Sequence, residues 1–191
     1  MPRLFTAIAL PEHVREALSA LEVPLPGAHW THEDNLHITL RFAGDIDNRI
    51  ADEFASELDS IDLDSFMLRF SGAGAFGGND PRILYMGVEP NDALDRLARA
   101  SERAARNAGL PPVSRAFKPH VTLARMRHAR VDAVARFLQR NGVFKCPPIA
   151  VTRFYLMSSR PKTGGGPYVE EAVYPLQGAA AYAGEDAQSI W

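Results

Sequence analysis

Residues 36–40 read LHITL and residues 119–123 read PHVTL, and these two short stretches decide the fold. Each contains a His-x-Thr unit, and the two histidines, His37 and His120, lie 83 positions apart in a chain of 191 residues. A repeat at nearly half the chain length indicates two related halves. In both stretches hydrophobic residues alternate with the His and the Thr, as in a strand with one buried face. We therefore predict that each half contributes one strand carrying an imidazole and a hydroxyl on the same face.

The chemistry of the repeated unit follows from strand geometry. The His and the Thr of one unit stand about 7 Å apart along a strand. If the two halves face each other, His37 and His120 meet across one cleft. One neutral and one protonated imidazole can coexist there near pH 7, because the ordinary pKa of histidine is about 6.5. Thr39 and Thr122 can donate hydrogen bonds to phosphate oxygens, so the pattern indicates cleavage of a phosphodiester.

Charge is unevenly distributed in this chain, whose net charge is −2. Eight acidic residues and one basic residue lie between positions 45 and 64, whereas seven basic residues and no acidic residue lie between positions 103 and 131. A local positive field fits a small anionic ligand or an RNA end, and a solvated basic face is the alternative. Arg125 and Lys118 flank the second motif within this basic stretch. Arg41 follows the first motif with the parity of its histidine, so all three are candidate substrate contacts.

The remaining pattern predicts an α+β layout for a chain that is 46% hydrophobic and 23% charged, an ordinary globular composition. Short polar connections between several strands favour mostly antiparallel sheets over a doubly wound parallel one. Strands are expected at residues 5–10, 35–42, 65–72, 82–88, 117–124, 149–158 and 168–176. Helices are expected at residues 12–21, 46–58 and 131–140 and between Asn91 and Gly109. Loops are expected at residues 23–32, 72–81 and 159–167.

Other sites have less support from the sequence. The single cysteine, Cys146, can form no internal disulfide and is expected to be a small buried hydrophobe in a reducing cytoplasm. No Asp, Glu or Cys shares the strand parity of either motif histidine, so no metal and no cofactor are expected, and a catalytic metal is the competing interpretation. The other histidines, His13, His29, His32 and His128, are expected at the surface. No secretory signal or membrane span is expected, because the longest apolar runs are too short.

The motifs and their flanks resemble the 2H phosphoesterases, a superfamily defined by two His-x-Thr-x motifs. Within it the chain is similar to the RNA 2′,3′-cyclic phosphodiesterases, also called 2′-5′ RNA ligase-like proteins. The likeness spans roughly residues 3–177 and is carried by residues 3–11, 35–44, 117–125 and 174–176. Ala116 departs from the pattern, because relatives often have proline there.

The resemblance implies a bilobal fold in which two pseudo-symmetric, mostly antiparallel sheets line a central cleft, with helices on the outer faces. Residues 1–178 would form this single domain, with its motifs at residues 37–40 and 120–123. Residues 179–191 lie outside the likeness, and we expect them to be a mobile tail.

The resemblance also implies a reaction, which is the opening of a 2′,3′-cyclic phosphate to a 2′-phosphomonoester without a metal or cofactor. His37 would be the proton donor to the 3′ oxygen and His120 the base that activates water, while Thr39, Thr122 and Arg125 would hold the phosphate. Two alternatives stay open: a reversible 2′-5′ RNA ligase and a noncatalytic module that binds RNA ends or nucleotides. The expected partners are RNA ends or nucleotides with a 2′,3′-cyclic phosphate. A cytoplasmic monomer with no membrane contact and no obligate protein partner is the expected setting.

Overall fold

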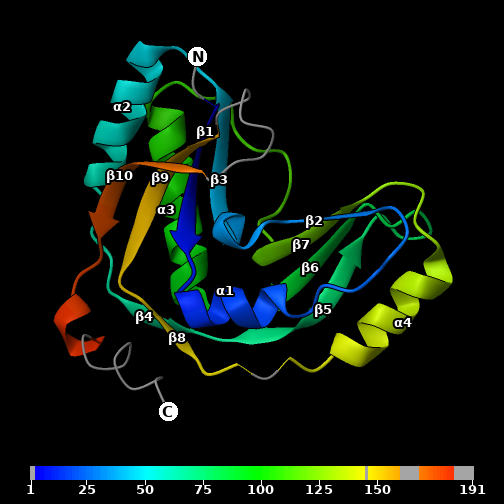
Figure 1. Ribbon diagram of the computed structural model, residues 1–191. Coiled ribbons are helices and arrows are strands. Elements are labelled where there is room, and N and C mark those ends of the chain that lie inside the picture. Colours follow the sequence, from blue (N-terminus) through cyan, green and yellow to red (C-terminus); the bar gives the residue numbers. More distant parts are fainter. Residues whose placement is uncertain (1–2, 145, 160–167, 183–191) are drawn as a thin grey trace.

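Antiparallel strands build most of the molecule, as the computed structural model shows for residues 3–144, 146–159 and 168–182 (Figure 1). The strands are β1 (Arg3–Ala9), β2 (Ala28–Trp30), β3 (His37–Asp45), β4 (Phe66–Leu68), β5 (Phe70–Phe76), β6 (Ile83–Val88), β7 (His120–Met126), β8 (Ile149–Val151), β9 (Arg153–Ser159) and β10 (Val169–Pro175). The helices are α1 (Glu12–Ser19), α2 (Asn48–Asp59), α3 (Asp92–Asn107) and α4 (Val131–Asn141), with short 3₁₀ helices at Glu33–Asn35 and Ala179–Tyr182. The predicted α+β class with mostly antiparallel pairing is confirmed.

The two motif strands meet in the middle of the main sheet. Its strand order is β10-β9-β1-β3-β7-β6-β5, with β2 also paired to β7, and β4 and β8 form a separate ribbon. Ile38 of β3 pairs with Val121 of β7. These two residues occupy the same position in the two motifs, so the halves are related by an approximate two-fold axis at this pair.

Helices cover the face of the sheet opposite the motif side chains. α3 packs on β3 and on α2, and Figure 1 shows it running behind β1 and β9. Asn91 begins α3 by accepting a hydrogen bond from the N–H of Leu94, as the predicted cap requires. Ile38 and Val121 are fully buried in the core. Because side chains alternate along a strand, this burial turns the neighbouring His and Thr of each motif to the open face.

A bulge follows the first motif and reverses the strand parity. Consecutive residues of β1 pair with Thr39 and Arg41, so Leu40 is an extra residue in β3. Leu40 and Arg41 are both buried, and Phe42 returns to the motif face. The prediction that Arg41 shares the face of the motif is therefore wrong, because parity counting assumes an uninterrupted ladder.

The second motif has the matching bulge. Consecutive residues of β6 pair with Thr122 and Ala124, so Leu123 is the extra residue in β7. Leu123 and Ala124 are both buried, and Arg125 emerges on the motif face. Parity alone would have placed Arg125 in the core, and the bulge is what makes it available to a ligand.

Two predicted loops contain strand residues. Residues 72–76 belong to β5, where the absence of a side chain at Gly72 lets the strand approach the end of α4: a Cβ there would lie 2.2 Å from the carbonyl oxygen of Gly142. Residues 28–30 form β2 within the other predicted loop. Most of the predicted 159–167 loop, residues 160–167, and residues 183–191 of the predicted tail lie outside the described residues. Across the described ranges, no helix has the length and apolar character needed to cross a membrane.

Candidate active site

A pocket of about 200 Å³ lies where β3 and β7 meet. Its lining joins both motif strands to β1, to the segment from the end of β2 through the first 3₁₀ helix, to the end of β9 and to the residue just before β10. The lining residues are Arg3, Phe5, Thr31, Asn35, His37, Thr39, Phe42, Thr122, Arg125, Ser159 and Tyr168. Larger hollows between α2 and α3 and beside α1 contain neither motif histidine.

The structure brings the sequence-predicted motif residues together. Because β3 and β7 are antiparallel and pair at Ile38 and Val121, the register sets His37 beside Thr122 and Thr39 beside His120. His120 is not among the residues that line the pocket, but its charge is close enough to lower the pKa of His37. The two imidazoles therefore lie on one face of one sheet and interact electrostatically.

His37 is held by its backbone and enclosed by aromatic rings. Its Nδ1 lies 2.7 Å from the carbonyl oxygen of Asn35, so Nδ1 is protonated and donates a hydrogen bond to that oxygen. Its Nε2 lies 2.9 Å from Oγ1 of Thr39, which donates to the neutral ring or accepts from the protonated ring. The rings of Phe5 and Tyr168 flank the imidazole, with centroids at 5.0 and 5.1 Å.

The pKa of His37 lies below its ordinary value. Burial is the largest cause, because it penalises the charged ring. The hydrogen bond to the carbonyl of Asn35 opposes this by favouring the charged ring, while the positive charges of His120 and Arg125 lower the pKa further. The mutual repulsion between the two rings favours states in which at most one of them is protonated.

His120 repeats this arrangement in a more open setting. Its Nδ1 lies 2.7 Å from the carbonyl oxygen of Lys118, so its Nε2 is the ring nitrogen that faces away from this backbone contact. Phe76 and Tyr85 flank the ring at 5.0 and 5.5 Å. Burial lowers the pKa of His120, the carbonyl hydrogen bond opposes that effect, and the charge of Lys118 lowers the pKa again.

The three predicted cationic contacts have three different placements. Arg125 is exposed and lines the pocket. Lys118 is exposed beside His120, with its ammonium 5.0 Å from the ring centre of Phe76, but it does not line the pocket. Arg41 lies on the opposite side of the sheet, so its role as a substrate contact is not supported.

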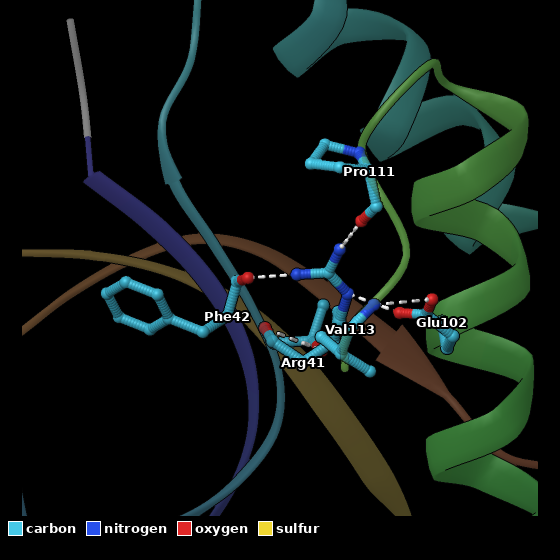
Figure 2. A network of polar contacts seen from close by, with 6 residues as sticks. Arg41, Phe42, Glu102, Pro111 and Val113 are labelled. Atoms are coloured by element: carbon cyan, nitrogen blue, oxygen red, sulfur yellow. Dashed lines mark hydrogen bonds and ion pairs between the residues drawn. The ribbon is translucent and has the colours of Figure 1, made fainter. Parts of the chain in front are cut away.

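Arg41 instead joins β3 to α3 and to the segment that follows α3 (Figure 2). It is 6% exposed and donates from Nε to Glu102 at 2.5 Å, from one terminal nitrogen to the carbonyl of Phe42, and from the other to the carbonyl of Pro111 at 2.6 Å. The second oxygen of Glu102 accepts from the N–H of Val113. This network fixes the backbone directly after the first motif.

The remaining predictions about side chains have mixed outcomes. Cys146 is partly buried against the core. His29, His32 and His128 are exposed, as predicted, whereas His13 is half-buried. Within the described residues, no group of three His, Cys, Asp or Glu side chains could hold a metal ion.

Several pocket residues escaped sequence reasoning. Tyr168 comes from the far end of the chain, and its N–H donates to the side chain of Asn35 at 3.0 Å. Thr31 reaches the pocket because its N–H donates to the carbonyl of Leu123, continuing the ladder of the unforeseen β2. Phe42 was hidden by the bulge. These pocket residues could have been predicted only from knowledge of which strands pair with one another.

Comparison with known proteins agrees with this geometry. The sequence profile of the family described as LigT like Phosphoesterase matches residues 8–85 and 87–168, and each matched segment contains one motif. The chain belongs to this family. The resemblance inferred from the motifs is thereby confirmed.

Relatives of this LigT-like phosphoesterase cover most of its length. An RNA 2′,3′-cyclic phosphodiesterase of Aeropyrum pernix is 31% identical over 88% of this chain and 94% of its own length. A protein of the same name from Thermotoga maritima is 31% identical over 82% of this chain and 86% of its own length. Among solved structures, Escherichia coli LigT complexed with 3′-AMP is 28% identical, with a TM-score of 0.75 and coverage of 93% of this chain and 99% of the LigT chain.

Proposed function

We propose that this LigT-like phosphoesterase hydrolyses 2′,3′-cyclic phosphates on RNA ends or nucleotides to 2′-phosphomonoesters by two-histidine acid/base catalysis. The observation that carries the proposal is the matched tethering of the two rings: both Nδ1 atoms donate to backbone carbonyls, so both Nε2 atoms face away from the backbone, and substrate would replace the contact that Nε2 of His37 makes with the Thr39 hydroxyl. The names of the relatives support the choice of substrate.

The pocket favours His37 as the acid and His120 as the base. In a 2′,3′-cyclic phosphate the leaving 3′ oxygen belongs to the ribose, so the acid must stand beside the nucleoside. The lining of the pocket includes His37 and does not include His120, so we place the nucleoside on the His37 side. Water then approaches phosphorus in line from the more open side, where His120 accepts its proton.

In the proposed reaction His120 gains one proton and His37 loses one. The water oxygen forms a bond to phosphorus while its proton moves to Nε2 of His120. The bond from phosphorus to the 3′ oxygen breaks, and that oxygen takes the proton from Nε2 of His37. The phosphate remains on the 2′ oxygen, and exchange with solvent restores both rings.

Three further side chains would stabilise the phosphate. The hydroxyls of Thr39 and Thr122 stand beside the two rings and can donate to its nonbridging oxygens. Arg125 lines the same pocket and can neutralise the charge that develops in the transition state. The anionic phosphate also favours the protonated form of the neighbouring His37, which offsets the burial that lowers its pKa.

The test is the conversion of 2′,3′-cyclic AMP by the purified protein in the presence of EDTA. We expect 2′-AMP as the product, resolved from 3′-AMP by chromatography. A variant with both His37→Ala and His120→Ala, purified in parallel, controls for a contaminating nuclease. Formation of 3′-AMP, or activity that disappears with EDTA, would contradict the mechanism. Binding of the nucleotide without turnover would favour a noncatalytic module instead.

A further inference from the structure

Asn35 contacts both the imidazole of His37 and the aromatic wall beside it. It ends the 3₁₀ helix Glu33–Asn35 and is 8% exposed. Its carbonyl oxygen accepts the hydrogen bond from Nδ1 of His37 at 2.7 Å, and its side-chain oxygen accepts from the N–H of Tyr168 at 3.0 Å. A buried amide side chain requires hydrogen-bond partners. Here one partner is the backbone of a residue that lies 133 positions later in the chain.

The backbone of Asn35 is fixed without help from its side chain. Its N–H donates to the carbonyl of His32 at 2.8 Å, and the N–H of Leu36 donates to the carbonyl of Glu33 at 3.0 Å. Leu36, which separates Asn35 from His37 in the chain, is buried in the core. A substitution at Asn35 therefore leaves the carbonyl tether of the imidazole in place and removes only the side-chain contacts.

The Tyr168 ring encloses His37 together with Phe5. It lies edge-on to the imidazole, with a centroid distance of 5.1 Å and an interplanar angle of 86°, and it meets the Phe5 ring at 4.9 Å. Phe5 is itself 5.0 Å from the imidazole, so the three rings contact one another pairwise. The described ladder between β10 and β9 begins at Val169, one residue after Tyr168. The hydrogen bond to Asn35 therefore fixes the backbone of Tyr168 just outside the strand pairing.

The second motif has a related arrangement at the equivalent position, Lys118. Its carbonyl oxygen tethers His120, and its ammonium lies 5.0 and 5.5 Å from the ring centres of Phe76 and Tyr85, the two rings that flank that imidazole. In each half, the residue two positions before the histidine contacts the imidazole through its backbone and a flanking aromatic residue through its side chain. This recurrence indicates a function in holding the ring.

We propose that Asn35 is a positioning residue for His37, because its side chain holds Tyr168 against the imidazole that its carbonyl orients. The effect on catalysis rests on the proposed function, in which His37 is the acid, whereas the enclosure of the ring can be measured without substrate. Burial is the largest cause of the lowered pKa of His37. Release of Tyr168 admits water to the ring, so the pKa of His37 should rise toward its ordinary value.

The charges around His37 stay the same when Asn35 is replaced by another neutral residue. The charged or titratable groups that face the imidazole, or that line the pocket and the adjoining cavity of about 80 Å³, come from β1, α1, the first 3₁₀ helix, β7 and the segment that begins β10. They are Arg3, Arg15, Asp34, His120, Arg125, Tyr168 and Glu170. Asn35→Ala changes none of these groups, so a rise in the pKa of His37 would report the loss of enclosure.

NMR titration of the substrate-free protein is the first test. The ring signals of His37 and His120 are assigned from the His37→Ala and His120→Ala variants. In Asn35→Ala the pKa of His37 should rise, while that of His120 stays nearly unchanged. Tyr168→Ala should give the same rise, and the double variant should show no more than either single variant, because both substitutions remove one wall.

Steady-state kinetics on 2′,3′-cyclic AMP is the second test. Asn35→Ala should lower kcat roughly tenfold, because a less firmly held imidazole is less often aligned with the leaving oxygen. The basic limb of the kcat/KM profile should move to higher pH, since the acid then stays protonated further into the alkaline range. Asn107→Ala removes an exposed asparagine hydrogen bond to Glu57 outside the pocket and should match the wild type in both tests.

The two tests separate the positioning role from the proposed function. An unchanged pKa of His37 in Asn35→Ala, or an equal rise at His37 and His120, would overturn the positioning role while leaving the catalytic proposal intact. Failure of the wild-type protein to hydrolyse the substrate would instead refute the proposed function, and the titration would still decide whether Asn35 encloses the ring. Urea unfolding verifies that each variant is folded. If Asn35→Ala does not fold, Asn35→Ser replaces it, because the shorter side chain also loses the contact with Tyr168.

Discussion

The two motif strands, β3 and β7, share their chemistry and differ in what surrounds it. In both, Nδ1 of the histidine lies 2.7 Å from a backbone carbonyl two residues earlier, and two aromatic rings flank the imidazole. Directly after each motif, however, Arg41 and Phe42 of β3 stand where β7 has Ala124 and Arg125. The repeat supplies two similarly tethered imidazoles, and the surroundings leave His37 more enclosed than His120.

The largest expected effect on activity comes from removing either imidazole. His37→Ala and His120→Ala should each lower kcat by about 10²–10⁴-fold, because each removes one proton transfer. The double variant should lose far less than the product of the two effects, since the rings act as a unit. Steady-state kinetics on 2′,3′-cyclic AMP measures all three values.

The stability of the histidine variants separates catalysis from folding. Neither ring is part of the hydrophobic core, so the free energy of unfolding should change by no more than about 1 kcal/mol. A global loss of structure in either variant would mean that the ring supports the fold, and the matched catalytic roles would then be unsupported.

The second difference between the motif strands is Arg41 of β3, which forms a buried hydrogen-bond network where β7 has Ala124. Arg41→Met should destabilise the protein by about 2–4 kcal/mol, because it leaves Glu102 and two carbonyl groups without their buried partner. Glu102 is partly exposed, which keeps the expected effect below that of a fully buried pair. Urea denaturation measures the change.

Arg3→Met provides the matched control for Arg41. The guanidinium of Arg3 faces Asp45 at 3.7 Å, but both side chains are more than half exposed, so its loss should cost less than about 1 kcal/mol. Equal effects of the two substitutions would show that the Arg41 network contributes no more than a surface ion pair.

The alternation of side chains along a strand predicted the face of each residue only where the strand is regular. Alternation placed His37 with Thr39 and His120 with Thr122, and the structure agrees, because no bulge lies between the His and the Thr of either motif. It failed one step later at Arg41, because a bulge depends on the partner strand and leaves no local trace in sequence. Arg125 became a candidate because it lies in the basic stretch beside the second motif, and the family resemblance gave it a phosphate-binding role. The bulge explains why strand parity could not have found it.

The same limit applies to residues that join the pocket from a distance. Tyr168 lies 131 positions after His37 and reaches it through the order of β9, β1 and β3 in the sheet. Strand propensity predicts that Tyr168 begins a strand, but the choice of neighbouring strands is a property of the whole fold. Sequence therefore predicted the arrangement of the motif residues better than the pocket walls that surround them.

The smallest expected effect assigns the two proton-transfer roles. Lys118 contributes a positive charge that lowers the pKa of His120. Lys118→Met should raise that pKa, whereas Lys118→Arg should leave it nearly unchanged. The base must be neutral to act, so kcat/KM falls as the pH drops through its pKa. With His120 as the base, the acidic limb of the pH profile therefore moves to higher pH in Lys118→Met, and activity is lost below neutrality while it is retained above.

The direction of this shift distinguishes the two assignments. If His120 were the acid, the same rise in its pKa would move the basic limb to higher pH and extend activity on the alkaline side. Because the two rings interact, each limb of the pH profile reports a pKa of the coupled pair and not of one ring. The roles are therefore assigned from the difference between the profiles of Lys118→Met and Lys118→Arg. A displaced basic limb would exchange the roles of His37 and His120, and it would also place the nucleoside on the more open side of the site.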